Sequence, residues 1–215
     1  AKSMELIGQL YGKEDRAAQF NAFFTEQMGK VQSVIAAQTD LPRPLVFVER
    51  AGGYSEDCCM SFGAENFGRM VEEAGGTNMA TPFIPGTFGT VNAEQIVASN
   101  PDTIIVTGGN WEAYVPGGAW VGVAPGADMG AAKDKLAGLM QRPAFVGTKA
   151  VKDGQVHAIW HQFYNNPYSF VAVQQIAKWL HPDLFADLDP EAALKELHAR
   201  FLPVEYKPGY WVSLN

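Results

Sequence analysis

Residues 93–106 read AEQIVASNPDTIIV, and this stretch decides the fold. Its first seven residues have the spacing of a short helix that carries Ile96 and Val97 inward. Pro101 ends the helix, and Asp102 turns the chain into TIIVT, an apolar run at residues 103–107 typical of a buried strand. A helix that passes through one tight turn into such a strand predicts a βαβ unit.

The same alternation extends outward in both directions. Two further short, apolar runs, PLVFVE at residues 44–49 and QVHAIW at residues 155–160, also predict strands. Helical spacing predicts helices at residues 64–74, 93–99, 131–141, 170–180 and 190–201, the last with Asp189 as its N-cap. Strands that alternate with helices predict an α/β domain whose mainly parallel central sheet is flanked by helices.

The longest helical pattern precedes the first strand and runs from Glu14 to Gln38. Its apolar residues recur every three or four positions, as on one face of a helix. At 1.5 Å per residue, about 25 residues span ~37 Å, which exceeds the length of an average globular helix. We expect this helix to span the whole molecule, and Ala1–Leu10 before it reads as a helix fragment.

Composition narrows the function. The chain has 215 residues, of which 47% are hydrophobic, enough for one α/β domain with a buried core. A net charge of −7 without a basic stripe argues against nucleic-acid binding. No apolar run approaches the roughly 20 residues that cross a bilayer. No Ser-His-Asp order, phosphate-binding loop or catalytic carboxylate pair stands out, so we expect neither an enzyme nor a cofactor or resident metal site.

Several segments resemble one family. Residues 93–106 resemble the "E-x-I-l-a-l-x-P-D-v-I-i" segment of ABC-importer binding proteins for iron-siderophores, haem and cobalamin. RPAF at residues 142–145 and AVKDGQVHAI at residues 150–159 are similar to the family's "R-P-x-w … A-V-k-d-G-r-V-y", and HPDLF at residues 181–185 is similar to its "l-h-P-e-l-F". These segments follow the family's order and spacing over roughly residues 10–203.

The resemblance implies a class III periplasmic binding protein, in which two lobes joined by one long helix hold the ligand between them. Residues 1–12 would then be a remnant of the N-terminal lobe, 13–39 the interlobe connecting helix and 40–215 the C-terminal α/β lobe. The true N-terminus and its export signal would lie upstream. Because bending the helix would break backbone hydrogen bonds, we expect only a small closure of the lobes.

The resemblance also implies a role in transport. A solute-binding component of an ABC importer would capture a metal chelate and deliver it to the membrane permease. It would work in the periplasm or lipid-anchored at the outer face of the cell membrane, which it would touch only through the permease or the anchor. A ferric siderophore is the first expectation and cobalamin or haem the second. A bare metal ion is third, because the chain has only four His.

Residues that could bind this ligand follow the three predicted strands, at glycine- and asparagine-rich turns (51–53, 108–109 and 165–167). The carboxyl edge of an open α/β sheet is where ligands bind. Arg50 could hold a carboxylate of a chelate through two parallel hydrogen bonds, or could pair with a neighbouring acid. The aromatic residues suit a flat ligand, or alternatively a small core under a long loop. The expected ligand-binding residues are Arg50, Tyr54, Trp111, Tyr114, Trp120, His161, Tyr164 and Tyr168.

Five residues, His161 among them, have a functional and a structural interpretation. His161 could ligate a ferric ion directly, but a hydrogen-bonded structural role is more usual, and His157 inside its strand is expected to be structural. In the family, a glutamate at the position of Glu94 pairs with permease arginines; otherwise Glu94 is a solvated helix residue. Adjacent Cys58 and Cys59 could form a vicinal disulfide, although two small buried residues without chemistry are favoured.

Two redox proteins remain as alternatives of another class. A nitrogenase-like reductase component would need cysteines spaced to hold an iron–sulfur cluster. A single adjacent pair of cysteines does not offer such spacing. A flavodoxin-like domain would need a phosphate-binding loop after the first strand, which AGGYS at residues 51–55 imitates only faintly.

Overall fold

The three strands predicted from the sequence lie side by side in one sheet. The computed structural model describes residues 2–215, so the part of the predicted lobe remnant at Ala1 lies outside it. β1 (Leu45–Glu49), β5 (Thr103–Gly108) and β6 (Val156–Trp160) pair in parallel, with Val46 opposite Thr103 and Ile104 opposite Val156. All six residues of β5 are buried, as expected for a central strand that is covered on both faces.

Four short strands complete the β-structure. β3 (Thr77–Asn78) extends the sheet beyond β1 in parallel, and β7 (Trp211–Ser213) pairs antiparallel with β6, which gives the order β3-β1-β5-β6-β7. β2 (Met60–Phe62) and β4 (Phe88–Thr90) form a separate antiparallel ribbon. None of the four was predicted, because two or three residues are too few to show a hydrophobic period.

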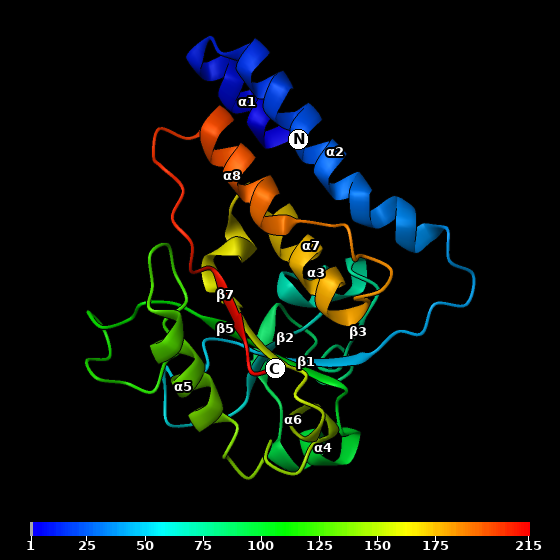
Figure 1. Ribbon diagram of the computed structural model, residues 1–215, viewed down its shortest axis with the longest axis vertical. Coiled ribbons are helices and arrows are strands. Elements are labelled where there is room, and N and C mark those ends of the chain that lie inside the picture. The colour runs from blue at the N-terminus through cyan, green and yellow to red at the C-terminus, as the bar shows by residue number, and fades with distance from the viewer. Residues whose placement is uncertain (1) are drawn as a thin grey trace.

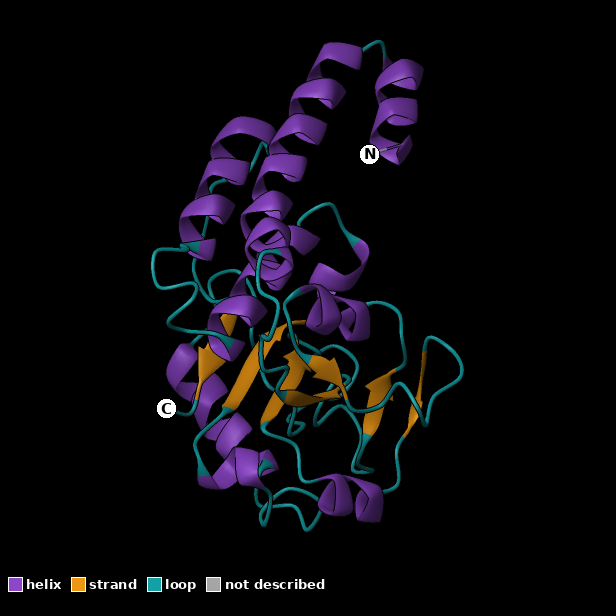
Figure 2. Cartoon of the chain, turned by 90° about the vertical axis from the view of Figure 1, so that its right-hand side faces the viewer, coloured by secondary structure: helices purple, strands orange, loops and turns teal. Residues whose placement is uncertain are grey.

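Helices cover both faces of the sheet (Figures 1 and 2). Phe47 and Val48 of β1 point to opposite faces and belong to two separate hydrophobic clusters, one under each helical layer. One layer contains α2 (Glu14–Ala36), α3 (Phe67–Glu73), α7 (Ser169–Leu180) and α8 (Pro190–Phe201), with α1 (Lys2–Tyr11) beside α2. The other layer contains α4 (Ala93–Ser99), α5 (Met129–Leu139) and the single turn α6 (Lys149–Lys152). The predicted α/β fold with a mainly parallel sheet is therefore confirmed.

The turn from α4 into β5 forms as predicted. Asn92 begins the helix with a capping box, and Asn100 ends it in the left-handed conformation at φ 48°. Asp102 then accepts hydrogen bonds from the backbone N–H of Leu45 at 2.8 Å and from Lys149 Nζ at 2.6 Å, which fixes the turn against its neighbours. One detail of the prediction is wrong: Ile96 is fully buried, but Val97 is 55% exposed because a seven-residue helix buries only one narrow face.

The long helix predicted before the first strand is α2, whose 23 residues give a length of ~34 Å. Its middle is fastened to α7: the rings of Phe23 and Phe170 meet edge-on at 5.5 Å, and Gln174 Nε2 donates to the carbonyl oxygen of Gln27 at 2.9 Å. The fragment predicted before it is the helix α1, which packs beside the first half of α2.

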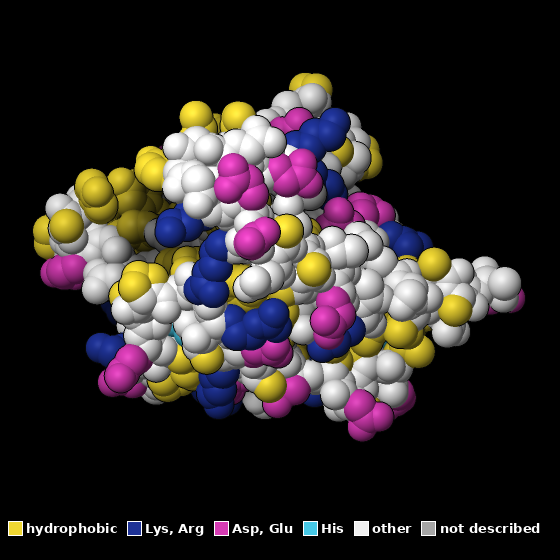
Figure 3. Space-filling view, turned by 90° about the horizontal axis from the view of Figure 1, so that it is seen from above, with side chains coloured by type: hydrophobic (Ala, Val, Ile, Leu, Met, Phe, Trp, Pro, Cys, Tyr) yellow, Lys and Arg dark blue, Asp and Glu magenta, His cyan; other side chains and the backbone are white. Residues whose placement is uncertain are grey.

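α1 leaves several large apolar side chains exposed. Leu10 and Tyr11 are 72% and 76% exposed, and Leu6 and Ile7 are also exposed. Figure 3 looks down on this helical layer and shows hydrophobic side chains gathered along one side of it, while charged side chains spread over the middle. No helix among residues 2–215 combines the length and apolar character needed to cross a membrane.

Candidate functional site

The candidate site lies where the three central strands end. β1 runs into the connection at residues 50–59, β5 into a long loop at residues 109–128, and β6 into the 3₁₀ turn η1 (His161–Asn165). Because these strands are parallel neighbours, the three connections meet at one edge of the sheet. Gly53, at φ 78°, lets the first connection pass directly against the backbone of Ala119 in the second, where a Cβ would collide.

Four rings, one or two from each connection, lie in contact across this edge. Tyr54 meets Trp111 edge-on at 5.4 Å, Trp111 meets His161 at 5.8 Å, and His161 meets Tyr164 at 4.9 Å between ring centroids. Phe62 of β2 lies behind them, 6.2 Å from His161 and 6.4 Å from Tyr164. We call Tyr54, Trp111, His161 and Tyr164 the aromatic row; Tyr54 is 42% exposed, whereas only 9% of Trp111 is exposed.

A hydrogen bond from a residue of β5 holds His161 in place. Its Nδ1 lies 2.9 Å from Oγ1 of Thr107, a fully buried residue near the end of β5. Burial, and next the positive charge of Arg50, lower the pKa of His161 to about 4. The imidazole is therefore neutral near pH 7.

Arg50 brings a positive charge to the row. Its guanidinium lies 4.4 Å from the ring centroid of Phe88 and 2.8 Å from the sulfur of Met60. Among residues 2–215, no carboxylate forms a salt bridge with Arg50. The alternative that Arg50 pairs with a neighbouring acid is therefore wrong within the described chain, and its charge is left unneutralised.

Besides Arg50, three of the predicted ligand-binding residues lie outside the row. Trp120 donates from Nε1 to the carbonyl oxygen of Val115 at 2.9 Å and so packs within its own loop, as the small-core alternative predicts. Tyr114 is 75% exposed on the same loop. Tyr168 lines a groove of about 370 Å³ with Met4 of α1 and Phe201 of α8. The side chain of Asn165 lies outside the described part of the structure.

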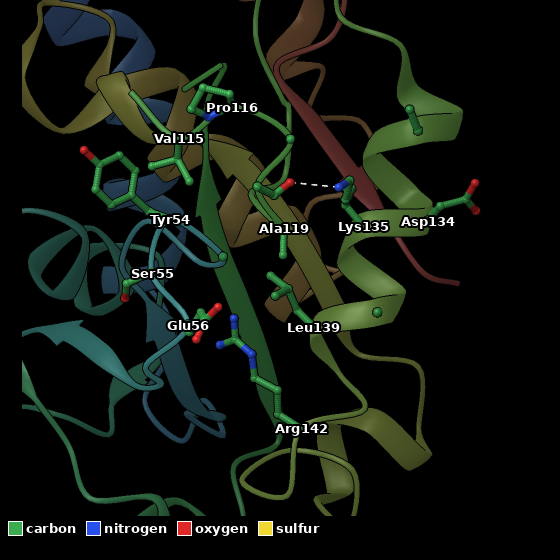
Figure 4. Close-up of a pocket in the computed structure, with 15 residues that line it drawn as sticks. Tyr54, Ser55, Glu56, Val115, Pro116, Ala119, Asp134, Lys135, Leu139 and Arg142 are labelled. Atoms are coloured by element: carbon green, nitrogen blue, oxygen red, sulfur yellow. Dashed lines mark hydrogen bonds between the residues drawn. The ribbon is translucent and has the colours of Figure 1, made fainter. Parts of the chain in front are cut away.

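A larger cavity of about 990 Å³ opens next to the row (Figure 4). Tyr54, Ser55 and Glu56 form one side and α5 forms the other; Tyr54 alone belongs to both the cavity and the row. Lys135 of α5 donates to the carbonyl oxygen of Gly118 at 2.8 Å and so ties the loop to the helix. The cavity and the row are thus neighbouring parts of one edge of the sheet.

A buried ion pair lies at the floor of this cavity. Arg142, just beyond α5, donates from Nη1 to Oε1 of Glu49, the last residue of β1, whose side chain is only 3% exposed. Oε2 of Glu49 has no hydrogen-bond partner among the described residues. Burial raises the pKa of Glu49, against the opposing attraction of Arg142. The sequence analysis missed this pair, because nothing in the sequence indicates that residues 93 positions apart will meet.

The structure contradicts the prediction made for the two cysteines. Cys58 and Cys59 are joined in a vicinal disulfide just before β2, so the favoured reading of two residues without chemistry is wrong. Cys59 is 1% exposed, and its carbonyl oxygen accepts from the N–H of Val91 at 3.1 Å. The disulfide lies at the end of the connection that carries Arg50 and Tyr54.

Two other candidate residues, His157 and Glu94, lie outside the aromatic row. His157 stacks on Trp179 at 4.3 Å and bonds Ser213 Oγ at 2.7 Å, and burial lowers its pKa to about 3, which fits the structural role expected for it. Glu94 is exposed on α4. No three His, Cys, Asp or Glu side chains within residues 2–215 lie close enough together to hold a metal ion.

Of the two other residues of the site that the sequence analysis missed, Thr107 and Phe62, only Thr107 could have been found. Thr107 is the last residue of the predicted strand TIIVT, and a hydroxyl at the carboxyl end of a strand is a signal in itself. Phe62 carried no signal, because its strand is three residues long and lay outside every predicted element.

The chain is similar in sequence and in fold to proteins already characterised as a family. The family model described as "Periplasmic binding protein" matches residues 1–161. The solved structure of the TroA-like periplasmic binding protein FepB from Veillonella parvula superposes with a TM-score of 0.90 at 27% identity, over 100% of this chain and 60% of that chain. A search of curated proteins gives no match.

Two more distant structures share the fold. They are the molybdate-bound periplasmic binding protein MolA of Haemophilus influenzae (TM-score 0.69, 19% identity, 96% of this chain and 56% of that chain) and a periplasmic haem-binding protein of Pseudomonas aeruginosa (TM-score 0.63, 19% identity, 85% and 59%). This chain thus spans about three-fifths of the length of these relatives. Because the family model covers well over half of the chain, the chain belongs to the periplasmic binding protein family.

Proposed function

We propose that this chain forms one wall of a ligand cleft and captures a ferric siderophore, or a similar metal chelate, for import by an ABC transporter. The observation that carries the proposal is the aromatic row beside an unneutralised Arg50. Residues 40–215 would be the lobe that forms this wall, residues 13–39 the connecting helix and residues 1–12 part of a second lobe opposite.

The chemistry of the edge suits such a chelate. Ferric complexes of catecholates and of many hydroxamates present flat organic groups and oxygen atoms, often with a net negative charge. Tyr54, Trp111 and Tyr164 supply ring faces and edges for the flat groups, and Arg50 supplies a positive charge with several N–H donors. An anionic chelate would be attracted to this edge, whereas a free metal cation would be repelled by Arg50.

Cobalamin or haem is the second candidate, because the greasy, ring-lined edge also suits a tetrapyrrole. Titrating each ligand into the full-length protein while tryptophan fluorescence is recorded would separate them. We expect a ferric catecholate to quench the fluorescence most strongly. Saturable quenching by haem or cobalamin alone would transfer the proposal to that ligand.

Arg50→Met tests the main contact and has a matched control in Arg43→Met. Arg43 is a surface arginine that pairs with Glu72 at 2.9 Å, far from the row. We expect Arg50→Met to weaken binding of an anionic chelate about tenfold or more, and Arg43→Met to leave it unchanged, since hydrogen bonds to charged groups are worth ~1.5–3 kcal/mol. Equal affinities of the two variants would contradict the proposal.

Delivery to the permease is the second half of the function, in the periplasm or at the outer face of the cell membrane. We propose Glu94 on α4 as a docking residue. In cells that take up a labelled ferric chelate, Glu94→Arg should reduce uptake without changing binding. Glu26→Arg, at an exposed position of α2 in the opposite helical layer, is the control. Normal uptake by Glu94→Arg cells would rule out the docking role.

The family favours transport over the two redox alternatives. The disulfide points the same way, because Cys58 and Cys59 are bonded to each other and present no thiolate to an iron–sulfur cluster. We therefore assign the chain no catalytic residue.

A further inference from the structure

We propose that Thr107 is a positioning residue that fixes His161 as the tautomer protonated on Nε2, so that the cleft presents an N–H donor there and not a nitrogen lone pair. This inference rests on the proposed function and narrows it. At His161 the ligand would offer an oxygen acceptor, as a chelate with its metal already enclosed does, rather than a metal ion in search of a ligand.

The hydrogen bonds of Thr107 carry the argument. Its Oγ1 accepts the backbone N–H of Ala51 at 2.9 Å, so one lone pair is in use. The hydroxyl proton then has two possible acceptors, Nδ1 of His161 at 2.9 Å and the carbonyl oxygen of Glu49 at 3.4 Å. The first distance is normal for a hydrogen bond and the second lies at the outer limit. We infer that the hydroxyl donates to the nearer acceptor, Nδ1.

The charge state of His161 completes the assignment. The imidazole is neutral near pH 7, because burial and Arg50 both disfavour the imidazolium form. A neutral imidazole has one N–H and one acceptor nitrogen. With Nδ1 as the acceptor, the proton resides on Nε2.

Of the two ring nitrogens, Nε2 is the one that keeps some exposure to solvent. It has no hydrogen-bond partner among the described residues, and it is not one of the buried side-chain atoms shielded from solvent. The ring cannot easily turn over to exchange its nitrogens, because Trp111 and Tyr164 flank it and Phe62 lies behind it. Nε2 of His161 and the nearby Arg50 would both offer N–H donors here, which suits carboxylate, catecholate or hydroxamate oxygens.

Nuclear magnetic resonance of the ¹⁵N-labelled chain tests the tautomer without any ligand. Long-range ¹H–¹⁵N correlations distinguish a protonated from an unprotonated ring nitrogen. We expect Nε2 of His161 to be protonated and Nδ1 not. The opposite pattern would overturn the inference. Nickel(II) added as a probe should leave the His161 signals in place, and broadening centred on them would overturn it as well.

Two substitutions test the role of Thr107. Thr107→Ser retains the hydroxyl and should keep the wild-type tautomer, whereas Thr107→Val removes the donor and should let the other tautomer appear. A Thr107→Val spectrum like that of the wild type would overturn the role. If Thr107→Val fails to fold, the wild-type spectrum together with Thr107→Ser still decides the tautomer.

Binding by the full-length protein tests the ligand. His161→Gln can place an N–H near the position of Nε2, and His161→Phe cannot. We expect a ferric catecholate to bind His161→Gln within about threefold of the wild type and His161→Phe about tenfold more weakly, as for one lost hydrogen bond. Equal binding by both variants would overturn the ligand assignment. A wild-type protein that binds no chelate would overturn the proposed function, while the tautomer is judged by its spectrum alone.

Discussion

Arg142 donates to Glu49 beneath the cavity, where both side chains are largely removed from water. A buried ion pair is costly to desolvate, so it contributes little net stability compared with apolar side chains of the same volume. The position of the pair matters more than its stability. Glu49 ends β1 and Arg142 follows α5, so the pair fixes the two sides of the cavity with respect to each other.

Removing one partner of this ion pair should destabilise the protein strongly. Arg142→Met leaves the Glu49 carboxylate buried and alone, and we expect the free energy of unfolding to fall by about 3 kcal/mol in urea at pH 7. The double variant Glu49→Leu/Arg142→Met should recover most of the loss. Arg43→Met, which removes an exposed ion pair, should cost less than about 1 kcal/mol. An Arg142→Met loss as small as that of Arg43→Met would show that Glu49 is not held as a buried charge.

Two histidines should make the protein sensitive to acid. The pKa values of His161 and His157 are lowered to about 4 and about 3, whereas the ordinary value is 6.5. Below pH 6.5 the unfolded chain therefore binds protons that the folded chain does not, and stability falls as the pH drops from 6.5 towards 4. Above pH 6.5 this contribution is fully present.

Urea unfolding at pH 7, 6, 5 and 4.5 measures this dependence. His157→Phe should flatten the curve by up to ~1.4 kcal/mol per pH unit, the value of one proton per unit. Lys30→Met, at an exposed position of α2, should leave the slope as it is. A His157→Phe curve parallel to that of the wild type would mean that His157 titrates alike in the folded and unfolded chain.

The vicinal disulfide predicts the thiol chemistry of the purified protein. Because Cys58 and Cys59 are bonded to each other, denatured protein kept free of reductant should not react with maleimide. After treatment with a dithiol reductant, it should take up two labels per chain, which mass spectrometry would count. Two labels without reduction would contradict the disulfide.

Trp111 and Trp120 should differ in binding although both lie on the loop after β5. Trp111 contacts Tyr54 and His161, whereas Trp120 donates to its own loop. If the proposed function holds, Trp111→Leu should weaken chelate binding about tenfold, since aromatic residues carry much of the energy in binding sites. Trp120→Leu should reduce the stability of the loop and leave affinity nearly unchanged. The reverse order would move the site toward α5.

The sequence allowed the fold to be predicted wherever a hydrophobic period is long enough to read. α2, the α4–β5 unit and the three central strands were found within about two residues of their bounds. β2 and β4 were not found, because a three-residue strand owes its existence to tertiary contacts and not to its own pattern.

The site could be predicted only in part, for a related reason. Tyr54, Trp111, His161 and Tyr164 were all chosen because they follow strands, and the parallel sheet brings them together. Tyr168 follows the same strand as Tyr164 and both line grooves beside α1, but only Tyr164 also meets His161 in the aromatic row. Whether a residue meets its neighbour across a turn such as η1 depends on local backbone angles, which residue type alone does not determine.

The attachment of α2 to α7 has a mechanical consequence. Phe23 and Gln27 anchor the middle of a rod ~34 Å long, so the rod can pivot with the lobe but has little freedom to bend. Because the rod is held at its middle, a tilt of about 5° displaces each end by ~1.5 Å, about half the length of one hydrogen bond. If the proposed function holds, α2 would thus act as a lever arm, and side chains between α2 and α7 that never touch the ligand would tune the gap facing the aromatic row.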